Sequence, residues 1–399
     1  MDVRGKKNIG IFIPELGGGG AERVAQILGN YYVSQGNKVY YFLADMDIKQ
    51  DYPVKGEIIR TNIKSCLCNT SNDIQRLWKL FQSSFKMRAL KSQYKIEVAI
   101  SFMEEFNYLN ILSKGNEKVI VRICTILSPR QDLGGLLYKK EIVHFFYSKA
   151  DKVIVMSQYA LKDMKDHYRI PLKKIIKIPN PIVDLSIQED KETWTFGEKV
   201  VLCVGRLEPV KQQERIIRAF SIVCNKVSDA RLIILGKGFR LTYLRELCKR
   251  LDIEKFVIFI GFTENVKYYL EHARVFVMAS KVEGFPNSMV EAMKYGVPII
   301  TTDAPGACGE IVGKPKSSIE TRTMMLCKYG ILTPNISEKK HIMNFELTED
   351  ETILSDAMLK VLIEDETYKR YRRQSFKRAK MYSLDKVMKR WNDIIKETK

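Results

Sequence analysis

The chain of 399 residues is long enough for two domains, and its 45% hydrophobic and 28% charged content excludes a disordered protein. A net charge of +19 favours anionic partners: phosphorylated ligands, acidic membranes or nucleic acid. No zinc-finger spacing, aromatic RNA-binding signature or basic heptad pattern accompanies that charge, which disfavours nucleic acid. No apolar run approaches the roughly 18 residues of a membrane span, and the scattered cysteines indicate reduced thiols in the cytoplasm.

The N-terminal segment has the pattern of a strand, a glycine-rich loop, a helix and a second strand, at residues 9–14, 17–20, 21–35 and 38–43. This order is the usual start of a Rossmann-like domain. The loop fails the G-x-G-x-x-G pattern of dinucleotide sites because Glu22 or Arg23 stands where the last glycine is required. The loop is therefore either a flexible turn or a place where the backbone approaches a ligand closely.

Residues 73–94 are predicted to form a long helix that carries an apolar stripe of Ile74, Leu77, Trp78, Phe81 and Phe85. The helix is basic, since no acidic residue occurs between 76 and 95. Two interpretations follow. The stripe faces the core and the basic face is solvated, or the helix lies on an anionic bilayer with its aromatic rings inserted.

The remaining chain alternates between predicted strands and helices. In the first half we expect strands at 98–102, 118–122 and 151–156 and helices at 142–148 and 157–167, followed by an irregular, proline-containing segment at 176–184 and a linker at 184–198. In the second half we expect strands at 200–204, 231–235, 257–260 and 275–279 and helices at 212–224, 241–250, 266–271, 349–363 and 384–395. Such alternation predicts parallel sheets covered on both faces, with ligands at the carboxyl ends of the strands.

Several residues suited to ligand binding directly follow predicted strands of the second half: Gly205, Arg206, Gly236, Gly261 and Glu283. Because the carboxyl ends of parallel strands share one edge, this coincidence predicts a single site. Arg206, together with a lysine five residues later, could bind a diphosphate, the guanidinium giving geometry and the ammonium a point charge. The alternative is a pair of ordinary surface cations.

The segment SKVEGFPNSMVEAMKYGVPIITT, which begins at Ser280, predicts a loop, a short helix and a strand. Asn287 or Ser288 is expected to cap the helix, whose N-terminus suits a phosphate group. Glu283 in the loop and Glu291 in the helix are candidates for accepting hydrogen bonds from sugar hydroxyls. An ordinary amphipathic helix with a solvated glutamate is the alternative.

Three of these segments resemble a known family. EGFPNSMVEA followed by GVPII, the heptad GRLEPVK and the early GGAERV are similar to elements of the retaining glycosyltransferases of family four, which have the GT-B fold. The resemblance covers nearly the whole chain. It implies an α/β protein with two Rossmann-like domains facing a central cleft: residues 1–184 for the acceptor, 185–380 for the nucleotide sugar, and 381–399 as a helix that returns to the first domain.

The resemblance also implies roles for individual residues. Glu283 would contact the transferred sugar and Glu291 the ribose, while Arg206 and Lys211 would contact the donor diphosphate, so that catalysis rests on Glu283, Arg206 and Lys211. The other donor-binding residues implied are Gly19, Gly20, Gly205, Gly236, Gly261, Phe262, Thr263, Gly284, Phe285, Pro286, Asn287 and Ser288. Many relatives have a histidine near residues 121–125. This chain has none there, which leaves Arg122 or Thr125 as candidates on the acceptor side.

The expected activity is retaining transfer of a sugar from a nucleotide-diphosphate donor, with UDP favoured, to a glycan or polyprenyl-diphosphate-linked acceptor. Neither a metal nor a cofactor is expected, because fixed cations and amide dipoles can stabilise the leaving diphosphate. The expected setting is bacterial capsule, exopolysaccharide or lipid-linked glycan synthesis in the cytoplasm, at the inner face of the plasma membrane through residues 73–94. A sugar-nucleotide epimerase of the same fold and a non-catalytic basic binding protein are the alternatives.

Overall fold

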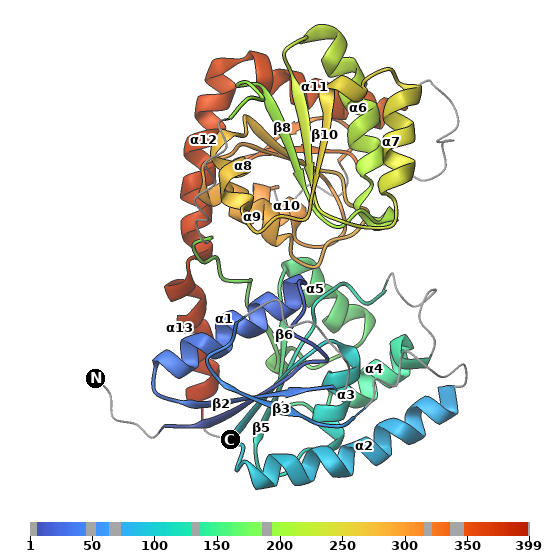
Figure 1. Cartoon of the computed structure of the whole chain (residues 1–399). Helices are drawn as coiled ribbons and strands as arrows, with labels where there is room; N and C mark the ends of the chain where they lie inside the picture. Colours follow the sequence, from blue (N-terminus) through green and yellow to red (C-terminus); the bar gives the residue numbers. More distant parts are fainter. Residues whose placement is uncertain are drawn as a thin grey trace. The chain divides into compact units, whose positions relative to one another are not determined.

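The chain forms two compact units, each built around a sheet of seven strands (Figure 1). The first unit comprises Met1–Pro181 and Asp385–Lys399, and the second comprises Ile182–Leu384. The computed structural model describes residues 6–44, 53–63, 73–128, 136–185, 194–314, 321–335 and 347–397. Two parallel-sheet, Rossmann-like halves confirm the expected fold class. Most of the expected linker, 186–193, lies outside the described residues.

The sheet of the first unit is parallel throughout its described pairings, with the order β3-β2-β1-β4-β5-β6-β7. Its central strands are buried along their whole length because helices cover both faces, which explains their unbroken apolar runs. The strands are β1 Asn8–Phe12, β2 Lys38–Leu43, β3 Glu57–Arg60, β4 Val98–Phe102, β5 Lys118–Arg122, β6 Lys152–Val155 and β7 Ile175–Lys177.

The helices of the first unit include the last helix of the chain, α13, as expected. Lys118 at the start of β5 fixes it there: its Nζ donates to the carbonyl of Ile394 at 2.5 Å and to that of Glu397 at 2.9 Å. The α-helices are α1 Gly20–Ser34, α2 Asp73–Gln93, α3 Glu104–Leu112, α4 Lys140–Tyr147, α5 Gln158–Lys162 and α13 Leu384–Lys396, with a π-helical turn at Asp163–His167 and 3₁₀ turns at Leu136–Tyr138 and Leu172–Lys174.

The second unit repeats the arrangement with the order β10-β9-β8-β11-β12-β14-β13, in which β13 is antiparallel to its neighbour. The strands are β8 Val200–Val204, β9 Arg231–Leu235, β10 Val257–Gly261, β11 Val275–Met278, β12 Ile299–Thr302, β13 Met325–Leu326 and β14 Ile331–Thr333. The α-helices are α6 Gln213–Lys226, α7 Leu241–Arg250, α8 Val266–His272, α9 Asn287–Lys294, α10 Cys308–Val312, α11 Glu349–Ile363 and α12 Asp365–Ala379, with 3₁₀ turns at Pro209–Lys211, Glu254–Phe256 and Lys380–Tyr382.

A buried ion triad links two of these helices. Glu351 of α11 accepts hydrogen bonds from Arg215 at 2.7 Å and Arg218 at 2.9 Å, both on α6, and all three side chains are at most 2% exposed. Burial opposes ionisation of the Glu351 carboxyl, but the hydrogen bonds from Arg218 and Arg215 outweigh it and hold its pKa below the usual range.

Several elements of the structure differ from the sequence predictions. Strands β3, β13 and β14 and helices α3 and α10 were not anticipated because each is short, and helix α12 was not anticipated because its sequence is strongly basic. Ile176 and Lys177 belong to strand β7, although the proline-rich character of 176–184 argued against regular structure. The pairing of β7 with β6 provides the hydrogen bonds that local pattern could not reveal.

Helix α2 turns a different face to the core than the aromatic stripe suggested. Its buried side chains are Leu80, Ser84, Met87 and Lys91, spaced four, three and four residues apart on one face. The aromatic residues Trp78, Phe81 and Phe85 are 61%, 46% and 62% exposed. The core-facing interpretation of this stripe is therefore wrong. The side chain of Ile74 lies outside the described residues.

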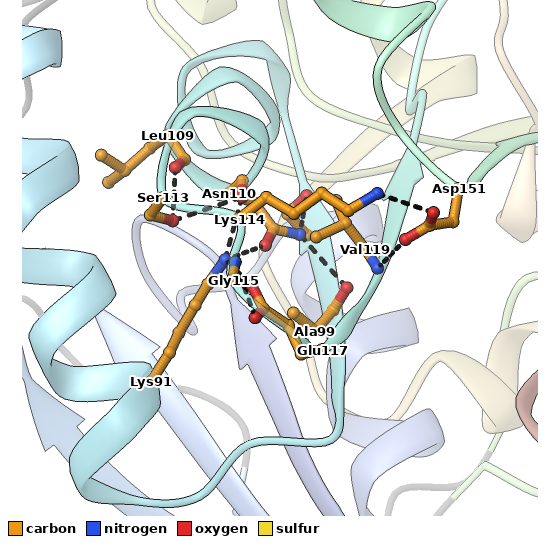
Figure 2. A network of polar contacts seen from close by, with 11 residues as sticks. Lys91, Ala99, Leu109, Asn110, Ser113, Lys114, Gly115, Glu117, Val119 and Asp151 are labelled. Atoms are coloured by element: carbon orange, nitrogen blue, oxygen red, sulfur yellow. Dashed lines mark hydrogen bonds and ion pairs between the residues drawn. The ribbon is translucent and has the colours of Figure 1, made fainter. Parts of the chain in front are cut away.

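A buried polar network holds the C-terminal part of α2 against α3 (Figure 2). The ammonium of Lys91 donates to the backbone carbonyl of Asn110 at 2.9 Å, to its side-chain oxygen at 2.7 Å and to Oε1 of Glu117 at 2.8 Å. Asn110 in turn donates to the carbonyl of Ala99 in β4. The network satisfies polar groups that would otherwise be costly to bury. No helix in the described part of the chain is both long and apolar enough to span a bilayer.

Candidate active site

Three adjacent strands of the second unit end in glycines that contact one another. The N–H of Gly236 after β9 donates to the carbonyl of Gly261 at 2.7 Å, and the N–H of Gly205 after β8 donates to Leu235 at 2.9 Å. A Cβ on Gly236, whose φ is +134°, would lie 2.0 Å from the carbonyl oxygen of Gly205. The three glycine backbones lie close together at this edge and carry no side chains. A ligand can therefore reach the peptide groups.

The ion pair between Lys211 and Glu283 lies at the same carboxyl edge. Lys211 ends the 3₁₀ turn that follows β8, and Glu283 stands in the loop after β11. The ammonium donates to Oε1 of Glu283, which also accepts a hydrogen bond from the hydroxyl of Ser280 at 2.7 Å. The carboxylate is 9% exposed and the ammonium side chain 24%, so the pair is only partly shielded from solvent.

Two buried thiols lie near this pair and stay protonated. Burial raises the pKa of Cys308, and the Glu283 carboxylate raises it further. Burial also raises the pKa of Cys203 to about 12, although the Lys211 charge opposes it. A raised pKa disfavours the thiolate form, so neither thiol is expected to act as a nucleophile.

The Glu283 backbone is fixed by the loop after β12. Its N–H donates to the carbonyl of Pro305 at 3.0 Å, and its carbonyl accepts from Ala307 at 3.2 Å. Gly306 lies between them with φ of +128°, and a Cβ there would lie 1.6 Å from the Glu283 carbonyl oxygen. Only glycine fits this position. Sequence reasoning missed Gly306, although DAPG just after a strand was an available turn signal.

Helix α9 directs its N-terminus toward the end of β8, because the hydroxyl of Ser288 donates to the carbonyl of Val204 at 3.3 Å. Glu291 is half-buried and lies three residues after Ser288, hence on the same side of the helix. The predicted cap is wrong: the N-cap residue is Pro286, and no side chain caps the helix. A helix N-terminus whose N-cap residue provides no capping side chain suits an anion.

Arg206 is not joined to the Lys211–Glu283 pair. Its side chain is 70% exposed and forms an ion pair with Glu208 at 3.0 Å, while the Gln213 amide binds its carbonyl at 2.8 Å. An exposed pair of this kind contributes little to stability, so the guanidinium can leave Glu208 for an anionic ligand at low cost. The structure thus places Arg206 beside the strand-end glycines and in solvent.

The aromatic residues expected near the donor differ in exposure. Phe262 is 57% exposed, with the ammonium of Lys237 5.0 Å from its ring centre. Phe285 is 9% exposed and packs edge-on against Tyr382, with ring centres 5.5 Å apart, so it supports the Glu283 loop from within. The hydroxyl of Thr263 accepts from the N–H of Asn265 and shapes the turn after β10.

The remaining candidates belong to the first unit. Gly19 precedes α1, which begins at Gly20, at the carboxyl end of β1. Arg122 is 1% exposed, and its guanidinium donates to the side-chain oxygen of Asn180 and, at 3.3 Å, to the thiol of Cys124. Its role on the acceptor side stays a prediction. Burial lowers the pKa of Arg122. Thr125 is half-buried.

Two successive Rossmann-like units with parallel sheets are the architecture of the GT-B fold class. The sequence model of glycosyltransferase family 4 matches residues 18–184, and that of glycosyl transferases group 1 matches residues 186–320. The chain therefore belongs to the family 4 glycosyltransferases.

Relatives span almost the whole chain. An uncharacterized glycosyltransferase of Methanocaldococcus jannaschii is 29% identical over 86% of this chain and 90% of its own. The N-acetylgalactosamine-N,N'-diacetylbacillosaminyl-diphospho-undecaprenol 4-alpha-N-acetylgalactosaminyltransferase of Campylobacter jejuni is 26% identical over 96% and 97%. The structure of Anabaena HepE in complex with UDP covers 97% of this chain and 99% of its own, with a TM-score of 0.74 and 16% identity. That last likeness shows the fold.

Proposed function

We propose that the protein is a retaining, metal-independent glycosyltransferase that moves a sugar from a UDP-linked donor to a lipid-linked glycan in cell-surface polysaccharide synthesis. The contact between Lys211 and Glu283 carries this proposal. In a nucleotide sugar one bond joins the sugar to the diphosphate. The Glu283 carboxylate can accept hydrogen bonds from sugar hydroxyls, and the neighbouring Lys211 ammonium can bind the diphosphate. The bond between sugar and diphosphate would therefore lie at this pair.

The donor would lie along the carboxyl edge of the second sheet. Lys211, Arg206 and the amides at the N-terminus of α9 would bind the diphosphate, Glu291 the ribose, and the backbone at Gly261 the base. As the glycosidic bond breaks, negative charge grows on the diphosphate, and fixed cations and amide dipoles stabilise it. The acceptor hydroxyl would attack from the face that the diphosphate leaves and pass its proton to a diphosphate oxygen. This route retains the anomeric configuration.

The comparisons support the choice of donor and acceptor. The Anabaena structure contains UDP, which favours a uridine nucleotide in this chain. The Campylobacter relative is named for a glycan on diphospho-undecaprenol, which favours a polyprenyl-diphosphate acceptor here. The +19 net charge agrees with ligands that are anionic diphosphates.

The test begins with a panel of nucleotide sugars, since a ligand that binds only the folded state raises the melting temperature. The stabilising donor is then incubated with short polyprenyl-diphosphate glycans, with and without EDTA, and the anomeric configuration of the product is read by NMR. Lys211→Ala should lower kcat about 100-fold or more, as expected for loss of one charged donor to a leaving group. Lys226→Ala, an exposed lysine at the far end of α6, is the matched control.

A wild-type rate for Lys211→Ala would refute the diphosphate assignment. Loss of activity in EDTA would refute metal independence, and an inverted product would refute retention. Release of free nucleotide and sugar in an altered configuration, without acceptor product, would identify an epimerase of the same fold.

We further propose that the protein binds the inner face of the plasma membrane through α2. The exposed rings of Trp78, Phe81 and Phe85 are adjacent, with centres 6.2 Å apart for the first pair and 5.0 Å for the second. Exposed Lys79 and Lys86 lie on another side of the same helix. Aromatic rings beside lysines fit the interface of an anionic bilayer.

Flotation with vesicles of phosphatidylglycerol and phosphatidylethanolamine tests this surface. The double variant Trp78→Glu/Phe85→Glu should bind at least about tenfold more weakly, because each buried ring contributes about 1.5–3 kcal/mol. Phe239→Glu, which alters a 79% exposed ring of the second unit, should bind as wild type. Equal flotation of all three proteins, or none by wild type, would remove the membrane proposal.

A further inference from the structure

The chain passes between the two units twice, at Pro181–Ile182 and at Leu384–Asp385. Backbone contacts within the second unit join these two crossings. The N–H of Ile182 donates to the carbonyl of Tyr382 at 2.8 Å, and Ile182 forms an isolated parallel bridge with Ser383. Tyr382 ends the 3₁₀ turn that follows α12 and is 6% exposed. Its backbone is therefore fixed at the place where the chain enters and leaves the second unit.

The side chain of Tyr382 packs against the loop that carries Glu283. Its ring lies edge-on to that of Phe285, with the ring centres 5.5 Å apart and the planes at 75°. Phe285 is two residues after Glu283, and residues 283–286 are all buried. Edge-to-face packing is a preferred geometry of aromatic pairs and depends on the orientation of both rings. The Tyr382 ring thus restrains the C-terminal side of the Glu283 loop.

Arg378, in the last turn of α12, supports the Glu283 backbone from a second direction. Its Nε donates to the carbonyl of Ile311 at 2.9 Å, and its Nη2 donates to that of Glu310 at 2.7 Å. Both carbonyls belong to α10, and a guanidinium suits the carbonyl groups at the C-terminal end of a helix. Helix α10 directly follows Ala307, whose N–H bonds the Glu283 carbonyl. Arg378 therefore fixes the element that holds this contact in place.

Arg378 and Tyr382 also contact each other. The guanidinium carbon of Arg378 lies 5.0 Å from the centre of the Tyr382 ring and 4.9 Å from that of Tyr329. The helix that carries Arg378 is itself attached to the interior, because the buried hydroxyl of Ser375 donates to the carbonyl of Val297 at 2.8 Å. Both supports of the Glu283 loop therefore come from one anchored helix end.

We propose that Arg378 and Tyr382 are positioning residues for the Glu283 carboxylate. They act through α10 and Phe285, which hold the backbone around Glu283, while Lys211 and Ser280 bond the carboxylate itself. A role of Glu283 in orienting the transferred sugar rests on the proposed function. The positioning of its loop does not, and it can be measured in the free protein.

Hydrogen exchange detected by mass spectrometry measures that positioning. In Tyr382→Leu and Arg378→Met, peptides that cover residues 281–286 and 303–309 should exchange about tenfold faster or more, because the contacts of the Glu283 backbone open more often. Peptides from α6 should exchange as in wild type. Arg378→Met keeps an unbranched stem over the two rings, so it decides the question if Tyr382→Leu does not fold.

Two matched variants separate the ring contact from other effects. Tyr382→Phe keeps the aromatic ring against Phe285 and should exchange as wild type. Arg373→Gln removes an exposed charge from the same helix and should also exchange as wild type.

Steady-state kinetics provides a readout that a loss of stability alone would not change. In Tyr382→Leu and Arg378→Met, kcat should fall about tenfold or more, because a small misplacement of a group that orients the substrate slows the reaction strongly. The Kd of UDP should stay within about threefold of wild type, since UDP lacks the sugar that Glu283 would orient. Tyr382→Phe should keep the wild-type kcat.

The proposal is overturned if both Tyr382→Leu and Arg378→Met exchange these peptides at the wild-type rate, if both keep the wild-type kcat, or if Tyr382→Phe behaves as Tyr382→Leu. Failure of the proposed function has a separate signature. Wild-type protein would then transfer no sugar from any nucleotide donor, while exchange around Glu283 would still be faster in the two variants.

Discussion

Lys91→Met tests whether the network of Figure 2 holds α2 in place. The substitution keeps the packing of an unbranched stem and removes the ammonium that bonds Asn110 and Glu117. Both partners of the ion pair are nearly inaccessible, at 3% and 4% exposure, so the Glu117 carboxylate would remain buried without its counter-charge. Breaking a buried pair in this way costs about 3–5 kcal/mol.

Hydrogen exchange detected by mass spectrometry measures that cost locally. Peptides that cover α2 and α3 should exchange about 100-fold faster or more in Lys91→Met, because each 1.4 kcal/mol of lost opening free energy gives about a factor of ten. Peptides from the second unit should exchange as in wild type. Lys91→Met/Glu117→Gln, which removes both charges and keeps an acceptor for the Gly115 N–H, should recover much of the protection. Equal exchange in Lys91→Met and wild type would refute the reasoning.

The pH dependence of this effect has a definite sign. Burial lowers the pKa of Lys91 to about 8, although the Glu117 carboxylate opposes the shift. Between that value and 10.5 the unfolded chain binds more protons than the folded one, so the Lys91 contribution to stability rises with pH. The difference in urea-unfolding free energy between wild type and Lys91→Met should therefore grow by on the order of 2 kcal/mol from about pH 7.5 to 9.5. A constant or shrinking difference would contradict a lowered pKa.

Two further predictions concern the second unit. Gly236→Ala should abolish stabilisation by UDP in a melting assay, because its Cβ would lie 2.0 Å from the Gly205 carbonyl oxygen. Lys226→Ala, at the exposed end of α6, should bind UDP as wild type. Glu351→Leu leaves two guanidinium groups buried without a counter-charge and should lower the urea-unfolding free energy of the second unit by about 3–5 kcal/mol, and an unchanged midpoint would show that the triad is dispensable.

Much of the candidate site followed from the sequence because of a property of parallel sheets. Strand ends that are far apart in the chain share one edge, so Gly205, Gly236 and Gly261 could be placed together from pattern alone. The local sequence pattern could not show whether Arg206 or Lys211, which both follow β8, forms the ion pair with Glu283 after β11. Lys211 bonds Glu283 and Arg206 does not. That choice depends on the 3₁₀ turn Pro209–Lys211, which Gln212 ends with a φ of +48°.

Gly306 illustrates a second limit of sequence reasoning. It lies well beyond the helix that follows Glu283, and nothing in the spacing joins the two residues. Their contact arises because β11 and β12 are neighbours, which brings the loops that follow these strands together in a short parallel bridge. Gly306 is required only because it has no side chain, and the surrounding sequence does not show that requirement. Its role can be recognised from the folded backbone.

Helix α2 shows why periodicity alone cannot assign a helix face. Apolar residues at helical spacing mark a face that avoids water, and the pattern is the same whether a protein core or another apolar phase covers it. Here the core takes the face with Ser84 and Lys91, where the polar groups find partners, and leaves Trp78 and Phe85 exposed. Each ring left in water loses about 1.5–3 kcal/mol of burial free energy. The core instead contains the charged Lys91 side chain, whose burial is costly. The free energy lost by leaving these rings in water would be recovered if a partner outside the chain covered them. An anionic bilayer could contact both the rings and the lysines beside them.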